Sequence, residues 1–258
     1  MDKSKALKGI REDLNLGRVS LGSWIQSASL ENAQIIGRSG YDWAVIDMEH
    51  GSISNSQLPM LFYALESGGT LPLVRVAEAT ERECRLALDA GAGGVLLPMI
   101  KTSEQLESVI DFCTYPPAGK RGVGFCHGNN FGKDFDVSMR SEQFQRPLII
   151  AMIEHVDAFK DLNKITSVTR LDATFVGPYD LSASMGITGK FNAVEFSKAL
   201  ETIKEVAKSN NKPRGFHVVN PSEEDLGRCV NEGYQFIAYS LDTVFLRVAA
   251  RRPSIVDE

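Results

Sequence analysis

The chain has 258 residues, of which 43% are hydrophobic and 24% are charged, a balance typical of a soluble globular protein. With a formal net charge of −5 and no basic block in the sequence, we do not expect the protein to bind nucleic acids. No apolar run is long enough to cross a membrane, and the charged first residues contain no apolar leader, so we expect a cytoplasmic protein. The 4 cysteines form no CxxC pair, which predicts reduced thiols rather than a disulfide or metal site.

Short apolar runs alternate with amphipathic stretches along the whole chain. The apolar runs are continuous rather than alternating, which is typical of parallel strands covered by helices. The predicted strands are 19–25, 43–48, 73–76, 94–99, 148–153, 173–177, 215–219 and 236–240. The predicted helices are 30–39, 56–67, 80–90, 103–113, 155–165, 193–209, 221–232 and 243–250.

Eight strand–helix alternations in about 250 residues predict an α/β protein with the (β/α)8 TIM barrel fold, as one domain spanning residues 1–258. Residues 1–17 precede the first strand and are predicted to form a short helical arm. The alternative is an open doubly wound sheet, but no GxGxxG turn follows the first strand and no P-loop motif is present.

The segments between the predicted strands and helices contain residues that typically begin or end a helix. Glycines 40, 68, 91 and 233 follow helical patterns, where a left-handed residue is expected to end the helix. Asn220 precedes a proline and two glutamates, which predicts the start of a helix. The Gly-rich segment 116–137 is predicted to be a long loop that reaches outward or toward a neighbouring subunit.

Ionisable residues follow several of the predicted strands. In a TIM barrel the carboxyl ends of the strands carry the chemistry, so these residues are expected to meet at one rim. Glu154 and Asp180 come from adjacent strands, and two carboxylates in one cleft repel each other unless a cation or proton lies between them. A hard divalent ion fits this pair. The alternative for Asp180 is a helix cap.

Three further residues are candidates for catalysis. His50 follows the second strand and is suited to act as a general base near neutral pH, with a core histidine as the alternative. Asp89, at the end of a helical pattern, is placed to pair with His50 and fix its tautomer, or is simply a surface residue. Arg75 ends a buried strand and needs a partner, either a structural carboxylate or a substrate oxyanion. His217 lies inside a strand and is predicted to be a core residue.

Six segments in order carry a resemblance to a known family: GYDW…IDMEH (40–50), LVRV (73–76), DAGA…LPM (89–99), YPPAGKRG (115–122), IE (153–154) and GPYDLSASMG (177–186). Together they resemble the metal-dependent (class II) pyruvate aldolases, the family of 4-hydroxy-2-oxoheptanedioate aldolase, with macrophomate synthase and 2-keto-3-deoxy-L-rhamnonate aldolase as relatives. The resemblance covers residues 21–246.

The resemblance implies a barrel of the phosphoenolpyruvate/pyruvate-binding type, assembled as a homo-oligomer (a hexamer or trimer) that exchanges C-terminal helices. It implies a divalent ion (Mg²⁺, Mn²⁺ or Co²⁺) held by Glu154 and Asp180. It also implies a seat for the pyruvate carboxylate on the backbone of Gly177, Tyr179 and Asp180, at the start of a helix.

The resemblance further implies that His50 is the general base, that Asp89 raises its basicity, and that Arg75 binds substrate and stabilises the enolate. The implied reaction makes or breaks a carbon–carbon bond between the pyruvate enolate and an aldehyde, and the implied substrate is a 4-hydroxy-2-oxo acid. Met152 departs from the family, which usually has glutamine at that position, and Tyr179 stands where the type member of the family has a small residue. Two alternatives stay open: a decarboxylase or carbon–carbon lyase acting on oxaloacetate or a related 2-oxo acid, and a non-catalytic barrel that binds a sugar acid.

Overall fold

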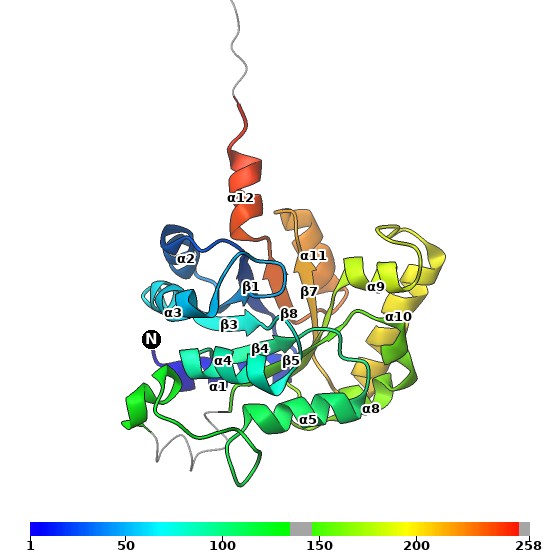
Figure 1. Ribbon diagram of the computed structural model, residues 1–258. Helices are drawn as coiled ribbons and strands as arrows, with labels where there is room; N and C mark the ends of the chain where they lie inside the picture. The colour runs from blue at the N-terminus through cyan, green and yellow to red at the C-terminus, as the bar shows by residue number, and fades with distance from the viewer. Residues whose placement is uncertain (135–145, 253–258) are drawn as a thin grey trace, which may run out of the picture.

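The computed structural model describes residues 1–134 and 146–252. Its centre is a closed barrel of parallel strands in chain order, in which the last strand pairs with the first (Figure 1). The strands are β1 (Ser20–Ile25), β2 (Trp43–Asp47), β3 (Leu71–Arg75), β4 (Gly94–Leu97), β5 (Leu148–Ile153), β6 (Ala173–Val176), β7 (Arg214–Val218) and β8 (Phe236–Tyr239). The predicted TIM barrel and all of its predicted strands are confirmed, with small shifts at the strand ends.

Helices surround the barrel. They are α1 (Lys3–Asn15), α2 (Leu30–Gly37), η1 (Asn55–Gln57), α3 (Leu58–Glu66), α4 (Glu81–Ala90), α5 (Ser103–Cys113), η2 (His127–Gly132), η3 (Val156–Lys160), α8 (Leu162–Ser167), α9 (Pro178–Ser184), α10 (Val194–Ser209), α11 (Glu223–Asn231) and α12 (Asp242–Ala249). The short helix α9, directly after β6, is an element that the sequence patterns did not predict. None of the helices in the described parts combines the length and apolar character that a membrane span needs.

Large side chains fill the barrel interior. The Trp43 ring lies flat on Phe236, with ring centroids 3.9 Å apart, and its indole N–H donates to the Ser20 hydroxyl. Gly22 faces Trp43 from β1, where a Cβ would lie only 2.2 Å from the indole, so this position accepts only glycine. Because the interior is packed, a binding site has room only at the ends of the barrel.

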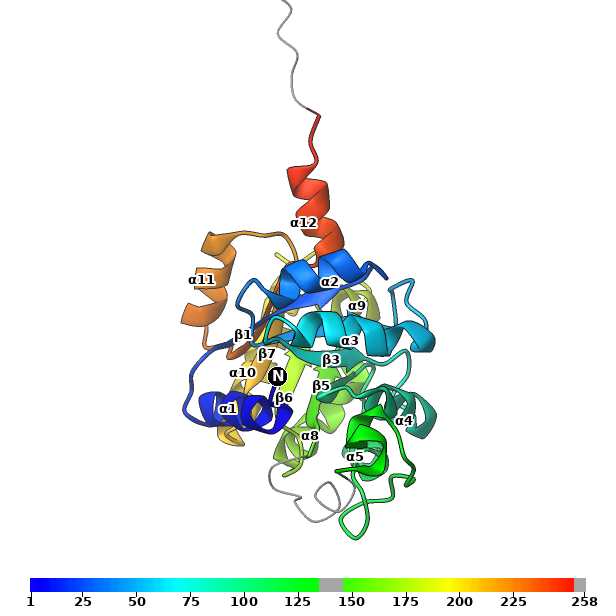
Figure 2. The same ribbon diagram turned by 90° about the vertical axis from the view of Figure 1, so that its left-hand side faces the viewer.

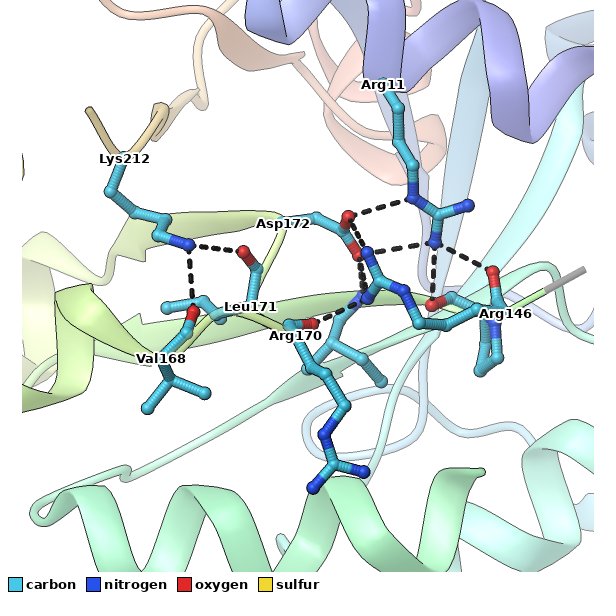
Figure 3. Close-up of polar contacts among 9 residues, drawn as sticks. Arg11, Arg146, Val168, Arg170, Leu171, Asp172 and Lys212 are labelled. Carbon is cyan, nitrogen blue, oxygen red and sulfur yellow. Dashed lines mark hydrogen bonds and ion pairs between the residues drawn. The ribbon is translucent and has the colours of Figure 1, made fainter. Parts of the chain in front are cut away.

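The helical arm covers the amino-terminal end of the barrel (Figure 2). Arg11 of α1 donates to the carbonyls of Arg146 and Pro147 and forms an ion pair with Asp172 at 2.9 Å. Figure 3 shows how Arg11 and Arg146 both reach the buried Asp172 carboxylate, while Lys212 caps two nearby carbonyls. The opposite end of the barrel, at the carboxyl ends of the strands, is therefore where a catalytic site can form.

Some connections differ from the sequence prediction. Within segment 116–137, η2 packs on α4, where Gly128 lies against the Leu88 carbonyl, whereas Val123 and Phe125 are exposed; residues 135–137 lie outside the described residues. The left-handed residue after α3 is Gly69 rather than Gly68, which instead lies against the backbone of α2. Ser222, not Asn220, caps α11, because its hydroxyl reaches the amide of Asp225.

Candidate active site

Arg75 and Asp47 form a two-point ion pair at the carboxyl ends of β3 and β2, where they are register partners. Arg75 Nε lies 2.9 Å from Asp47 Oδ1, and its Nη2 lies 2.6 Å from Oδ2. Both residues are buried. Burial pushes the pKa of Asp47 up, but the hydrogen bonds and the charge of Arg75 outweigh it, so the pKa is lowered overall. Asp47 therefore stays ionised and fixes the guanidinium at the rim.

The third nitrogen of Arg75 faces a second carboxylate. Nη1 lies 2.9 Å from Glu49 Oε2, without the geometry of a hydrogen bond. Burial raises the pKa of Glu49, the charge of Arg75 opposes that rise, and Asp180 is among the charges that add to it. The sequence reasoning missed Asp47 and Glu49 as site residues, although both stand in the same rim segment as His50.

Glu154 follows β5 and is almost completely buried, with 1% of its surface exposed. Its Oε1 accepts a hydrogen bond of 2.7 Å from the Met99 amide, but its Oε2 has no hydrogen-bond partner among the described residues. Burial raises the pKa of Glu154 to about 7; the Met99 amide opposes this rise, and the charges of Glu49 and Asp180 add to it. A cation at this position would remove the electrostatic cost of the buried charge.

Helix α9 brings the second predicted metal ligand to the same rim. It begins at Pro178, so Asp180 lies in its first turn, and the pKa of Glu154 responds to the Asp180 charge. Gly177 precedes the helix and lies against Glu154, where a Cβ would sit 2.4 Å from Oε2. The Tyr179 side chain is exposed and packs edge-on against Phe191.

His50 and Asp89 are not joined by a hydrogen bond in the described structure. The His50 amide donates to Asp47 Oδ1, and its side chain is exposed, which excludes the core-histidine alternative. Asp89 lies in the last turn of α4, where its Oδ1 accepts a hydrogen bond of 2.8 Å from Arg121 Nη2. The Cys126 thiol lies 3.7 Å from the same oxygen.

The prediction of His217 as a core residue was incomplete. Its side chain is partly exposed, and its ring stacks on Trp24 with centroids 4.9 Å apart. Its Nε2 lies 3.0 Å from the Ser240 carbonyl, and burial lowers its pKa to about 4. Met152, two residues before Glu154, is buried in the barrel interior.

No group of three or more histidine, cysteine, aspartate and glutamate side chains in the described residues is arranged as a ready metal cage. The donors at the rim are nevertheless those of a hard divalent cation, because Glu154 and Asp180 are carboxylates and Glu154 Oε2 is buried without a partner. The residues present therefore fit the ion that the resemblance implies.

A TIM barrel that gathers buried carboxylates and a fixed arginine at the carboxyl ends of its strands has the architecture of an enzyme, and the comparisons with known proteins specify the family. Residues 20–249 match the HpcH/HpaI aldolase/citrate lyase family, and the chain belongs to this family. It is a carbon–carbon lyase, and the non-catalytic alternative has no support among these relatives.

Two curated relatives and one solved structure illustrate the match. The chain is 32% identical over 237 residues to the 2-keto-3-deoxy-L-rhamnonate aldolase of Shigella dysenteriae, covering 91% of this chain and 87% of the relative. It is 29% identical to the hydroxypyruvate/pyruvate aldolase of Roseobacter denitrificans, over 93% of each chain. The crystal structure of an HpcH/HpaI aldolase/citrate lyase family protein from Burkholderia cenocepacia superimposes with a TM-score of 0.88 at 25% identity, covering 94% of this chain and 96% of that one.

Proposed function

We propose that the protein is a metal-dependent (class II) aldolase that makes or breaks the bond between the pyruvate enolate and an aldehyde, with a 4-hydroxy-2-oxo acid as substrate. The observation that carries this proposal is the buried, unpartnered oxygen of Glu154 beside Asp180, a carboxylate pair that calls for a cation. The names of the two curated relatives, both aldolases, support it.

In this proposal, Glu154 and Asp180 hold Mg²⁺, Mn²⁺ or Co²⁺. When bound, such an ion supplies Lewis-acid polarisation of a keto oxygen. The first-turn amides of α9, at Tyr179 and Asp180, have no partner within their own helix and are directed at the substrate carboxylate. Gly177 keeps the space beside Glu154 open.

Arg75 is assigned to the enolate oxygen. Its Nε and Nη2 are held by Asp47, whereas its Nη1 has only an ion-pair contact with Glu49 that lacks hydrogen-bond geometry. Nη1 is therefore the donor that can turn to a substrate oxygen while the other two keep the guanidinium in place. The positive charge of Arg75 is already in place where negative charge develops in the transition state. It therefore lowers the activation barrier without any rearrangement of the protein.

His50 is assigned the role of general base. Its exposed side chain takes the proton from the aldol hydroxyl through a bound water, and cleavage then releases an aldehyde while the enolate is protonated to pyruvate. The role of Asp89 in raising the basicity of His50 rests on the family resemblance, because Asp89 is bound by Arg121 in the structure.

We also propose that the protein is a homo-oligomer, a hexamer or trimer, in which α12 is exchanged between subunits. Helix α12 projects away from the barrel in both views (Figure 1, Figure 2). Its Leu246 is 62% exposed, which leaves an apolar side chain for a second copy to cover.

The proposal is tested by incubating the protein with Mn²⁺, pyruvate and a panel of aldehydes and analysing the products by mass spectrometry. We expect aldol adducts that disappear with EDTA and in Glu154→Gln and Asp180→Asn. Glu107→Gln, an exposed carboxylate on α5, is the matched control and should behave as the wild type. Release of CO₂ from oxaloacetate without any adduct would instead favour the decarboxylase alternative, and silence with every 2-oxo acid would contradict the proposal.

A further inference from the structure

Glu49 is a rim carboxylate that the proposed mechanism leaves without a chemical task. It follows β2, two residues after Asp47, and only 19% of its side chain is exposed. Its Oε2 is buried and has no hydrogen-bond partner among the described residues. The backbone at Glu49 is held in place, because its amide donates to Asp47 Oδ1 at 3.1 Å. Buried polar atoms in proteins are nearly always hydrogen-bonded, so an oriented carboxylate oxygen without a partner is a candidate for a catalytic role.

Neutralisation of Arg75 does not account for Glu49. Asp47 already accepts from Arg75 Nε at 2.9 Å and from Nη2 at 2.6 Å, and both members of this pair are buried. Glu49 approaches the same guanidinium only at Nη1, where the distance to Oε2 is 2.9 Å and hydrogen-bond geometry is lacking. One complete ion pair balances the charge of Arg75, so Glu49 brings a second, largely buried carboxylate that the fold does not require.

The position of Glu49 relative to a substrate follows from the role of Arg75. In the proposed function, Nη1 is the nitrogen that turns to the oxygen on C2 of the oxo acid, and the C3 methyl group is attached to the same C2 carbon. Because Glu49 Oε2 lies beside Nη1, it is near the C3–H bonds when that oxygen is bound. The other rim carboxylates are engaged, since Asp47 holds Arg75 and the remaining two are assigned to the ion.

We propose that Glu49 is a catalytic residue that removes a proton from the C3 methyl group of pyruvate to form the enolate, and that returns a proton to C3 when an aldol is cleaved. The inference rests on the proposed aldolase function and deepens it, because it names the group that moves the proton on carbon, whereas His50 serves the aldol oxygen.

The proton transfers balance in the direction of synthesis. The C3–H bond breaks, its proton goes to Glu49 Oε2, and its electron pair forms the C2–C3 double bond while the carbonyl electron pair moves to the oxygen beside Arg75. C3 of the enolate then attacks the aldehyde carbon, and the new alkoxide receives a proton from His50 through the bound water. The proton on Glu49 returns to His50 through solvent, which restores both groups, and cleavage follows the same steps in reverse.

The test measures exchange of the methyl protons of pyruvate for deuterium in D₂O by proton NMR, with Mg²⁺ and no aldehyde. Loss of the methyl signal reports cleavage of the C3–H bond alone, before any bond to an aldehyde forms. Glu49→Gln removes the base but retains an oxygen that can accept from Arg75, and we expect it to slow the exchange about 100-fold. Glu107→Gln makes the same change at an exposed carboxylate on α5 and should exchange at the wild-type rate.

A binding measurement separates catalysis by Glu49 from the positioning of Arg75. Kd for pyruvate is measured by isothermal titration calorimetry with Mg²⁺ present. We expect Glu49→Gln to keep Kd within about threefold of the wild type while the exchange is lost, because the lost interaction belongs to the transition state. Glu49→Asp retains a carboxylate on a shorter side chain and should exchange about 10-fold faster than Glu49→Gln. If Glu49→Gln does not fold, Glu49→Asp is compared with the wild type, and slower exchange at an unchanged Kd is the expected result.

The outcomes distinguish this inference from the aldolase function. Exchange that Glu49→Gln abolishes supports the inference even if no aldehyde in the panel is accepted. Exchange at the wild-type rate in Glu49→Gln, or a loss of exchange matched by an equal loss of pyruvate binding, overturns the inference, while aldol adducts would leave the aldolase function standing. Adducts from a wild-type enzyme that shows no exchange also overturn the inference, and the absence of both exchange and adducts overturns both proposals.

Discussion

The Met99 amide holds one oxygen of Glu154 at 2.7 Å and leaves the other oxygen without a partner, directed at Gly177. The protein thus orients the carboxylate, but only one of its two oxygens has a hydrogen-bond partner among the described residues. A buried polar atom left in this state normally costs stability, and such atoms are retained where a ligand completes them. This relationship determines how the protein should respond to pH, to metal and to substitution at the rim.

The stability of the protein without metal should fall as pH rises through the titration of Glu154. The pKa of Glu154 is about 7 in the folded protein, against 4.5 for an unperturbed glutamate. The folded state therefore binds more protons than the unfolded state between these values, and stability is lost as the pH rises. With EDTA present, Tm of the wild type should fall relative to Glu154→Gln between about pH 5 and about pH 8. Parallel Tm profiles for the two proteins would contradict the burial of this carboxyl.

A divalent ion should reverse that loss. Mn²⁺ that binds only the folded protein stabilises it by about 2.7 kcal/mol at a concentration about 100 times Kd. We expect Mn²⁺ to raise Tm of the wild type and of the surface variant Glu107→Gln, but not of Glu154→Gln or Asp180→Asn, measured by differential scanning fluorimetry. An equal rise in Tm for all four proteins would place the ion elsewhere.

Gly177→Ala should damage the site more than the fold. The new Cβ would lie 2.4 Å from Glu154 Oε2, so either the carboxylate or the start of α9 must move. Displacement of a metal ligand and of the carboxylate seat should reduce kcat/KM about 100-fold. Gly227→Ala, in helix α11 with nothing within 4 Å of its new Cβ, is the matched control and should keep full activity. A Gly177→Ala enzyme as active as this control would be inconsistent with close packing at the rim.

The Asp47–Arg75 pair should be important for stability as well as for catalysis. Removal of one member of a buried ion pair leaves an uncompensated charge, so Asp47→Ala should reduce the free energy of unfolding by about 3 kcal/mol, measured by urea denaturation. Glu201→Ala breaks an exposed pair with Lys204 and should have little effect. Similar losses in both variants would show that Arg75 finds another partner.

The fold could be predicted from the sequence because its strands are continuous apolar runs separated by helical patterns. No helical periodicity predicted α9, because its seven residues are too few to show one, and only the family resemblance implied that a helix starts there. Glu154 could be placed at the rim from the sequence alone, because residues that follow the strands of a TIM barrel lie at the carboxyl-terminal end of the barrel. By contrast, the partner of Asp89 is Arg121, which comes from a loop that no local pattern places. His217 looked like a core residue because apolar residues flank it, whereas the structure leaves it partly exposed and stacks its ring on Trp24.

The link between Arg11 and Asp172 has a consequence for handling the protein. Arg11 belongs to the first helix, yet its guanidinium holds a carboxylate and two carbonyls that lie far along the chain. Deletion of the first helix would remove the positive charge that balances the buried Asp172 carboxylate. Expression tags are therefore better added in front of the intact first helix than exchanged for it.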